Sequence, residues 1–156
     1  IRPCMVAMVG IPGCKKFISM HKTFLKPDGS GKAEMASPRK MMPGELQDGA
    51  CVMLSEWTGG TLGIAEGIET AMSASALYDM PVWAALNTSM LAKWLPPDDC
   101  EEVVIFADND PKFGGQKAAY AAAFRIATKG FNVSVKMPDT AGEDWADIWT
   151  AQRGRA

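Results

Sequence analysis

The chain has 156 residues, enough for one domain or for one domain with a small appendage. Hydrophobic residues make up 47% of the chain and charged residues 22%, as in globular proteins, and no apolar run approaches the ~20 residues that a membrane span needs. The formal net charge is −2, but residues 1–55 carry eight Lys or Arg against four Asp or Glu, whereas residues 56–156 carry eight against fourteen.

Residues 1–58 are predicted to form a small β-rich region that precedes a second domain over residues 59–156. Short apolar or alternating runs predict three strands, at residues 5–9, 17–25 and 50–54. Residues 36–49 contain two prolines and no clear period, so we expect a loop there. The basic character of this region fits a surface that approaches a polyanion, although ordinary surface charge explains it equally well.

Strands and helices alternate over residues 59–156. Apolar runs predict four strands, at residues 62–66, 81–86, 102–107 and 131–137. Helices are expected at residues 68–78, 90–95, 116–129 and 144–152. Near-continuous apolar strands separated by helices favour an α/β fold, a Rossmann-like four-stranded parallel sheet flanked by helices.

Acidic residues end the first and third of these strands. Glu66 follows four apolar residues, and Asp108 and Asp110 follow the run EVVIFA. In doubly wound sheets, ligands bind beyond the carboxyl ends of the strands, where the strand order reverses. If the order is 2-1-3-4, all three acids meet in one crevice. Residues two apart in an extended segment point the same way, so Asp108 and Asp110 can hold one ion while Asn109 points away or into the loop.

Carboxylates crowded in this way repel one another, by ~4 kcal/mol for an ionised pair at ~4 Å in an effective dielectric of about 20. Such a cluster needs a cation or protonation, and hard oxygen ligands suit Mg²⁺ or Mn²⁺. Glu66, Asp108 and Asp110 are therefore the predicted metal-binding and catalytic residues. Asp110 followed by Pro111 is also typical of a turn.

Other charged residues are weaker candidates. Glu69 lies in the first turn of a predicted helix, where it can be an outer ligand or simply an acid favoured by the helix dipole. Asp144 and Asp147 match a helix cap and its N3 partner as well as a metal role. The candidate nucleic-acid-binding residues are Lys22, Arg39, Lys40 and Lys117. Gly114-Gly115, just before Lys117, is either a phosphate-binding turn or a flexible loop.

Several other kinds of site are disfavoured. The four cysteines form no CxxC pair and the only histidine is His21, which argues against zinc and fits free thiols in a reducing cytoplasm. Gly31-Lys32 lacks the rest of a P-loop, and no GxGxxG follows a predicted strand. The five tryptophans are expected mostly to pack in the core rather than to stack on bases.

Three segments in order resemble the motifs of the Toprim family. They are GIAEGIETA at residues 63–71, IFADND at residues 105–110 and GEDWAD at residues 142–147. Residues 21–25 (HKTFL), 28–33 (DGSGKA) and 38–41 (PRKM) are similar to the segment that precedes Toprim in primase-like proteins of phages, plasmids and other mobile elements. Asn87 stands where the family often has a glycine.

The resemblance implies a Toprim-like fold and the activity of a DNA primase, a Mg²⁺- or Mn²⁺-dependent nucleotidyltransferase. Its partners would be single-stranded DNA and nucleoside triphosphates, and the helicase parts found in many such proteins make a helicase a further candidate. Glu66 would act as general acid/base or metal ligand, and Asp108 and Asp110 would bind Mg²⁺.

Other functions stay open. A Toprim-type nuclease would use the same acids, and a non-catalytic nucleic-acid-binding module could retain them. A topoisomerase needs an additional catalytic tyrosine, and both tyrosines of the chain lie in predicted helices. In the doubly wound phosphohydrolases the DxD motif ends the first strand, not the third.

Overall fold

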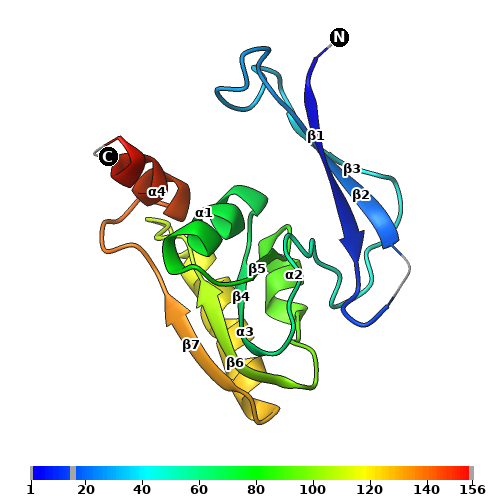
Figure 1. Ribbon diagram of the computed structural model, residues 1–156, viewed down its shortest axis with the longest axis vertical. Helices are drawn as coiled ribbons and strands as arrows, with labels where there is room; N and C mark the ends of the chain where they lie inside the picture. The colour runs from blue at the N-terminus through cyan, green and yellow to red at the C-terminus, as the bar shows by residue number, and fades with distance from the viewer. Residues whose placement is uncertain (1, 15–16, 155–156) are drawn as a thin grey trace.

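The computed structural model describes residues 2–14 and 17–154; Lys15 and Lys16, which contribute to the basic charge of the first region, lie outside them. The chain forms a small antiparallel sheet followed by a larger α/β unit (Figure 1). The strands are β1 (Cys4–Gly10), β2 (Phe17–Phe24), β3 (Arg39–Met41), β4 (Gly60–Ala65), β5 (Val82–Ala84), β6 (Cys100–Phe106) and β7 (Asn132–Lys136). The helices are α1 (Ile68–Tyr78), α2 (Thr88–Lys93), α3 (Gly114–Thr128) and α4 (Trp145–Arg153).

The N-terminal sheet has the order β1-β2-β3. Its third strand differs from the prediction, because β3 lies within residues 36–49, where we expected a loop. Residues 50–54 form no strand; Cys51 bridges to Gly10 and Val52 bridges to Ala84. Ala50, Cys51 and Val52 are buried between the two sheets, so their apolar character reflects this linking position rather than strand formation.

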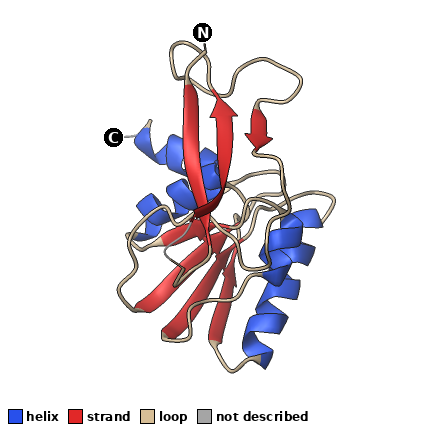
Figure 2. Cartoon of the chain, turned by 90° about the vertical axis from the view of Figure 1, so that its right-hand side faces the viewer, coloured by secondary structure: helices blue, strands red, loops and turns tan. Residues whose placement is uncertain are grey.

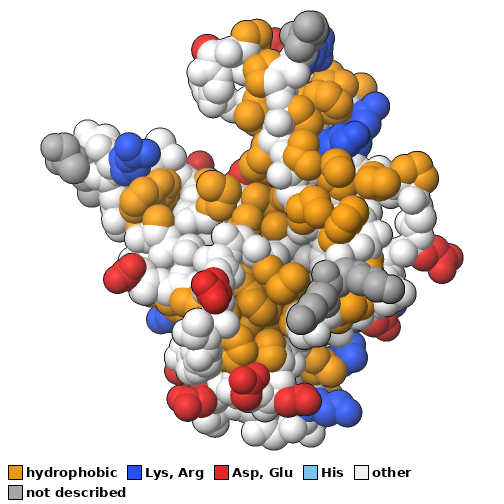
Figure 3. All heavy atoms as spheres, turned by 45° about the vertical axis from the view of Figure 1, so that its right-hand side comes forward, with side chains coloured by type: hydrophobic (Ala, Val, Ile, Leu, Met, Phe, Trp, Pro, Cys, Tyr) orange, Lys and Arg blue, Asp and Glu red, His pale blue; other side chains and the backbone are white. Residues whose placement is uncertain are grey.

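Alternation along β2 gives the N-terminal sheet a buried and an exposed face. Ser19, His21 and Thr23 are buried, and their face is turned inward. Val6 and Met8 of β1 are exposed on the outer face. In the space-filling view, hydrophobic side chains cover much of the upper part of the molecule, with Lys and Arg side chains at its right-hand border (Figure 3).

The larger sheet is parallel, as predicted, and its order β5-β4-β6-β7 is the order 2-1-3-4 on which the meeting of the acids depended. Helices lie on both of its faces, with α1 packed beside α4 and α2 beside α3 (Figure 2). Burial from both sides explains the continuous apolar runs: Leu62 and Ile64 of β4 and Val103 and Ile105 of β6 are fully buried. None of the helices in the described part of the chain combines the length and apolar character that a membrane span needs.

An aromatic cluster fixes α1 and α4 at the carboxyl end of β6. The rings of Phe106, Tyr78 and Trp145 lie 5.0–5.5 Å apart between centroids. The indole N–H of Trp145 donates a hydrogen bond to the carbonyl of Ala107 at 3.1 Å. The end of β6, just before Asp108, is therefore held in place by aromatic packing and by a buried hydrogen bond.

Gly63 in β4 allows close packing at the centre of the sheet. A Cβ at this position would lie 2.6 Å from Cγ2 of Val82 and 3.0 Å from the ring of Phe106. Replacing Gly63 by Ala should therefore lower the free energy of unfolding by about 1–3 kcal/mol, as expected for overpacking. Urea denaturation measures this, with Gly31→Ala as the control, because a Cβ at Gly31 meets nothing within 4 Å. Equal stability of the two variants would contradict the packing described for β4.

Candidate active site

Glu66 and Asp108 lie at the same edge of the parallel sheet. Glu66 directly follows β4, and Asp108 follows β6 after one residue. The two strands are neighbours, with Ala65 opposite Phe106 in the register. Both carboxylates are half-buried at this edge. The ends of β4 and β6 thus bring these two acids to one edge of the sheet.

The two carboxylates lie in an environment that disfavours their charge. Burial raises the pKa of Glu66, and the negative charges of Asp108 and Asp110 add to this, while Arg39 opposes it. Burial also raises the pKa of Asp108, with a further contribution from the charge of Asp144. The acids are close enough to repel one another, which is the property that a bound cation would relieve.

Asp108 is held by a hydrogen bond from Thr70, a residue that the sequence did not single out. The hydroxyl of Thr70 donates a hydrogen bond to Oδ1 of Asp108 at 3.2 Å, and Thr70 is only 5% exposed. Thr70 lies four residues after Glu66, at the start of α1. This spacing of about one helical turn places the two residues on the same side of the helix start, and it is the signal from which Thr70 could have been found.

Asn109 points into the loop, one of the two orientations expected for it, and holds the loop together. Its Nδ2 donates to the carbonyl of Pro138 at 2.8 Å, and its Oδ1 accepts from Nε2 of Gln116 at 3.0 Å. Gln116 also donates to the carbonyl of Asp110. Gln116 is buried in α3, and nothing in the sequence alone distinguishes it from a surface glutamine. This network fixes the backbone between Asp108 and Asp110.

Asp110 supports the turn that leads into α3. Its Oδ1 accepts a hydrogen bond from the amide of Lys112 at 2.9 Å, and its Oδ2 accepts from the amide of Gly114 at 3.2 Å. The turn role considered for this residue is therefore present. A carboxylate has about four lone-pair directions, so these two hydrogen bonds leave acceptor capacity for a cation. The Gly114 amide is already bonded to Asp110, and Gly115 lets α3 approach Asp108 closely, since a Cβ there would lie 3.0 Å from the Asp108 carbonyl.

The acidic edge does not form a complete metal site as it stands. Among the described residues, no three His, Cys, Asp or Glu side chains are grouped so that they could hold a metal ion. The donor chemistry nevertheless fits a hard cation, because the pKa values of Glu66 and Asp108 are raised partly by neighbouring carboxylates.

Glu69 connects the two parts of the molecule. Its carboxylate accepts from Arg39 at 3.0 Å and pairs with Nζ of Lys32 at 3.1 Å. Burial alone would raise the pKa of Glu69, but its own backbone amide and the two cations hold the pKa below its usual range. Glu69 is thus a partner of the N-terminal region, and Arg39 is the cation that this region brings to the acidic edge.

The buried face of the N-terminal sheet has polar atoms without partners near this bridge. Nδ1 of His21 and Oγ1 of Thr23 have no hydrogen-bond partner among the described residues, although the residues are only 9% and 1% exposed. Thr23 lies opposite Arg39 in the β2–β3 register. Burial and the charge of Arg39 hold the pKa of His21 below its usual value, so this face is polar without adding a charge.

Asp144 and Asp147 form the predicted cap of α4. Asp144 accepts from the amide of Asp147 at 2.9 Å, and Asp147 accepts from the amide of Asp144 at 3.2 Å. Asp144 also contributes to the raised pKa of Asp108, so it is the one of this pair that adds charge to the acidic edge. The structure gives Asp147 the capping role only.

The predicted nucleic-acid-binding residues are not on one surface. Lys22 and Lys40 are directly opposite each other in the β2–β3 register and exposed, while Arg39 alternates to the other face and reaches Glu69. Lys117 lies apart from them, exposed in the first turns of α3. Only Arg39 of these four is seen at the acidic edge.

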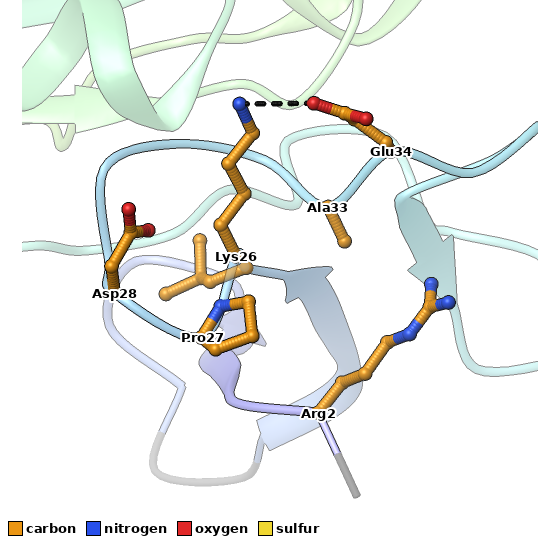
Figure 4. A pocket seen from close by; sticks show the side chains of 7 residues that line it. Arg2, Lys26, Pro27, Asp28, Ala33 and Glu34 are labelled. Carbon is orange, nitrogen blue, oxygen red and sulfur yellow. Dashed lines mark ion pairs between the residues drawn. The ribbon is translucent and has the colours of Figure 1, made fainter.

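A pocket elsewhere in the N-terminal region contains none of the predicted site residues. It has a volume of about 490 Å³ and is lined in part by Arg2, Lys26, Asp28 and Glu34. Lys26 and Glu34 pair at 3.2 Å above it (Figure 4). Since it lacks Glu66 and Asp108, we do not assign it to the chemistry of the acidic edge.

Comparison with known families identifies the larger unit. The Toprim domain family matches residues 61–156, more than half of the chain. The chain belongs to the Toprim domain family. Residues 1–53 of this Toprim protein match a second family, described as a domain of unknown function (DUF7146). A comparison with curated proteins finds no match.

Solved structures share the fold of this Toprim protein. One is a chain in the structure of bacteriophage T7 lagging-strand DNA polymerase interacting with primase domains of two gp4 subunits bound to an RNA/DNA hybrid and dTTP. It aligns with a TM-score of 0.62 and 18% identity, over 96% of this chain and 73% of that one. Another is a DNA primase domain from Pseudomonas aeruginosa, with a TM-score of 0.58 and 15% identity, over 87% of this chain and 43% of that one. At these identities the likeness establishes the fold.

Replacing Asp108 by Asn should stabilise the protein at pH 7, by of the order of 1 kcal/mol. The change removes a charge that Glu66 and Asp144 repel, and it keeps an oxygen for the Thr70 hydroxyl. A raised pKa means that the folded state binds more protons than the unfolded state, so stability falls as pH rises from about 4. The extra stability of Asp108→Asn over wild type should therefore be present at pH 7 and disappear near about pH 3, where the carboxyl is protonated in both the folded and the unfolded state.

Urea denaturation of wild type and Asp108→Asn at both pH values tests this expectation. Asp139→Asn serves as the control, because Asp139 is exposed and outside the site. If Asp108→Asn is no more stable than wild type at pH 7, the carboxylates do not repel one another as described.

Proposed function

We propose that this Toprim protein is the metal-dependent catalytic part of a DNA primase, which joins nucleoside triphosphates into a primer on single-stranded DNA. The observation that carries the proposal is the pair of half-buried carboxylates, Glu66 and Asp108, at the switch point of the sheet, each with its pKa raised by burial and by neighbouring charge. The resemblance of residues 21–41 to primase-like proteins, and a fold shared with a primase domain, favour primer synthesis over other Toprim chemistry.

A divalent cation fits the acidic edge chemically. Glu66, Asp108 and Asp110 would hold Mg²⁺ or Mn²⁺, and Asp144 would add negative charge from α4. When bound, such an ion polarises phosphoryl oxygens and balances the charge that develops on them. The repulsion among the carboxylates is then replaced by attraction to the ion, which is why this edge should bind cations in preference to the rest of the acidic surface.

The protein's own residues would position the reactants. Glu66, with its raised pKa, is suited to accept the proton of a primer 3′-hydroxyl. Thr70 fixes the orientation of Asp108, and the Asn109–Gln116 hydrogen bonds fix the backbone of the DxD segment. Arg39 and Lys32 pair with Glu69, and the charge of Arg39 also acts on Glu66 and Asp108, so these two cations would face an incoming triphosphate.

The two predicted regions would have different roles, template binding and catalysis. The basic region, residues 1–58, would guide single-stranded template with Lys22 and Lys40 on its outer face, through contacts to phosphates. The Toprim domain, residues 59–156, would hold the metal and the reacting atoms, with Lys117 exposed in the first turns of α3. A helicase is the further protein partner that we expect for an enzyme of this kind.

Replacing Glu66 by Gln should abolish primer synthesis while leaving the fold intact. The variant keeps the shape of the side chain but removes its charge and its capacity to accept a proton, so a loss of at least about 100-fold is expected. The measurement is oligoribonucleotide synthesis on single-stranded DNA with Mg²⁺ or Mn²⁺, with circular dichroism to check folding.

Glu101→Gln is the matched control, because Glu101 is exposed at the opposite end of β6. It should synthesise primers as wild type does. Metal-dependent cleavage of the template without synthesis would reject the primase proposal in favour of a nuclease. Full activity of Glu66→Gln would remove this residue from the chemistry.

Metal binding can be tested without activity. Titration with Mn²⁺ in a calorimeter should show a weak site in the wild type, and the double variant Asp108→Ala, Asp110→Ala should lose it, because the pair supplies the oxygen ligands. Heat release of equal size in both proteins would place the metal elsewhere and contradict the assignment.

A further inference from the structure

A strongly basic segment follows the acidic edge. Residues 111–138 contain five Lys or Arg and no Asp or Glu, within a domain that is otherwise acidic. The five are Lys112, Lys117, Arg125, Lys129 and Lys136. Four of them are exposed, and Arg125 is half-buried. The structure separates these cations: Lys136 lies over the ring of Tyr78, and Arg125 lines a pocket with Asp48, Asp98 and Asp99. Lys112 and Lys117 are the two at the start of α3.

The helix in this segment carries exposed aromatic side chains. Phe113, Tyr120 and Phe124 are 70%, 55% and 73% exposed. With Lys117, they are spaced four, three and four residues apart, so all four lie on one face of α3 or at its start. The opposite face, with Ala118, Ala119, Ala122 and Ile126, packs against the sheet. We call the four exposed residues Phe113, Lys117, Tyr120 and Phe124 the α3 face.

Packing does not explain the aromatic residue at the start of this face. Phe113 has a φ of 61°, in the left-handed region that glycine and asparagine adopt more readily. A bulky side chain there destabilises the fold, and with 70% of it exposed, little burial offsets this. A strained and exposed aromatic residue of this type indicates a role in binding.

The α3 face begins at the acidic edge itself. The amide of Phe113 donates to the carbonyl of Asp110 at 2.8 Å, and the amide of Lys117 donates to the carbonyl of Phe113 at 3.0 Å. From there the face runs along α3, which lies on the side of the sheet away from α1 and α4 (Figure 1). A chain bound along this face would thus have one end next to Asp110.

We propose that the α3 face binds single-stranded nucleic acid and leads it to the acidic edge, with bases stacked on Phe113, Tyr120 and Phe124 and phosphates beside Lys117. Aromatic rings interleaved with cations are the combination that binds single strands without sequence preference. The α3 helix carries no Asp or Glu, and the exposed ammonium of Lys117 lies among the three aromatic rings of the face, so the face complements a polyanion rather than an apolar protein partner. The inference rests on the proposed function for the direction of the strand, but not for its binding.

Binding of a fluorescent single-stranded oligonucleotide of thymidines, followed by anisotropy, tests the α3 face. Experiments in EDTA and in the Glu66→Gln background separate strand binding from metal and from synthesis. The double variant Tyr120→Ala, Phe124→Ala should bind about ten-fold more weakly, as expected for lost stacking. Lys117→Ala should reduce the dependence of log affinity on log salt by about 0.7.

Phe113→Asn distinguishes a binding role from a structural one. It should weaken binding about ten-fold and yet raise the melting temperature by about 2–4 °C, because Asn tolerates the left-handed backbone. If Phe113 served only the fold, Phe113→Asn would lower the melting temperature and leave oligonucleotide binding unchanged. Met72→Ala is the control, since Met72 is a 53% exposed side chain of α1, and it should bind as wild type does.

Three results would overturn the proposal. One is wild-type affinity in both Phe113→Asn and the double variant. Another is an equal loss of binding in Met72→Ala. The third is a combination of two observations. The wild type self-associates in light scattering and the double variant does not, while both bind the oligonucleotide equally well. The face would then be a protein interface. Failure of the primase proposal looks different: strand binding through the α3 face persists, but no primer is made.

Discussion

Parallel pairing of β4 with β6 forces two carboxylates to the same edge of a buried sheet. Once Ala65 is opposite Phe106, Glu66 and Asp108 cannot avoid each other, and both are too buried for water to screen their charges fully. Asp144 adds a further negative charge from α4. Two carboxylates that repel each other destabilise the fold, and the well-packed sheet beneath them offsets this cost. The same pair is suited to bind a cation, because a cation removes the repulsion.

The surroundings of the carboxylates hold them in place. Thr70 orients Asp108, and Asn109 ties the DxD segment to Pro138 and Gln116. The Trp145 indole links α4 to the carbonyl of Ala107, the residue before Asp108. These contacts come from different elements of the domain, and each is a buried or half-buried hydrogen bond, whose loss leaves an unpaired polar group. A site in which repelling groups are fixed by neutral partners can remain ordered without a bound cation.

Positive charge reaches the acidic edge from two sides. The N-terminal region contributes Arg39 and Lys32, which pair with Glu69. Thr23 lies opposite Arg39 in the register, and within the described residues neither its hydroxyl nor Nδ1 of His21 has a hydrogen-bond partner. The second source is the basic segment after Asp110. The domain thus has Arg39 and the start of this basic segment next to the carboxylates of Glu66 and Asp108, an arrangement that favours the approach of a polyanion to this edge.

The sequence by itself determined the α/β class and placed Glu66 and Asp108 at the ends of two strands, whereas the structure supplied the strand order that makes these strands neighbours. Apolar runs ending in acids, separated by helices, leave few ways to build a parallel sheet, and strand ends are local features. It misplaced β3, because an edge strand of three residues needs only a neighbour to pair with and has no apolar signature of its own. Only the tertiary structure decided that Asp110 supports a turn, that Arg39 and Lys40 face opposite ways, that Thr70 and Gln116 hold the site, and that Phe113 is strained. These depend on register, backbone angles and contacts between residues up to 38 positions apart, which no local pattern encodes.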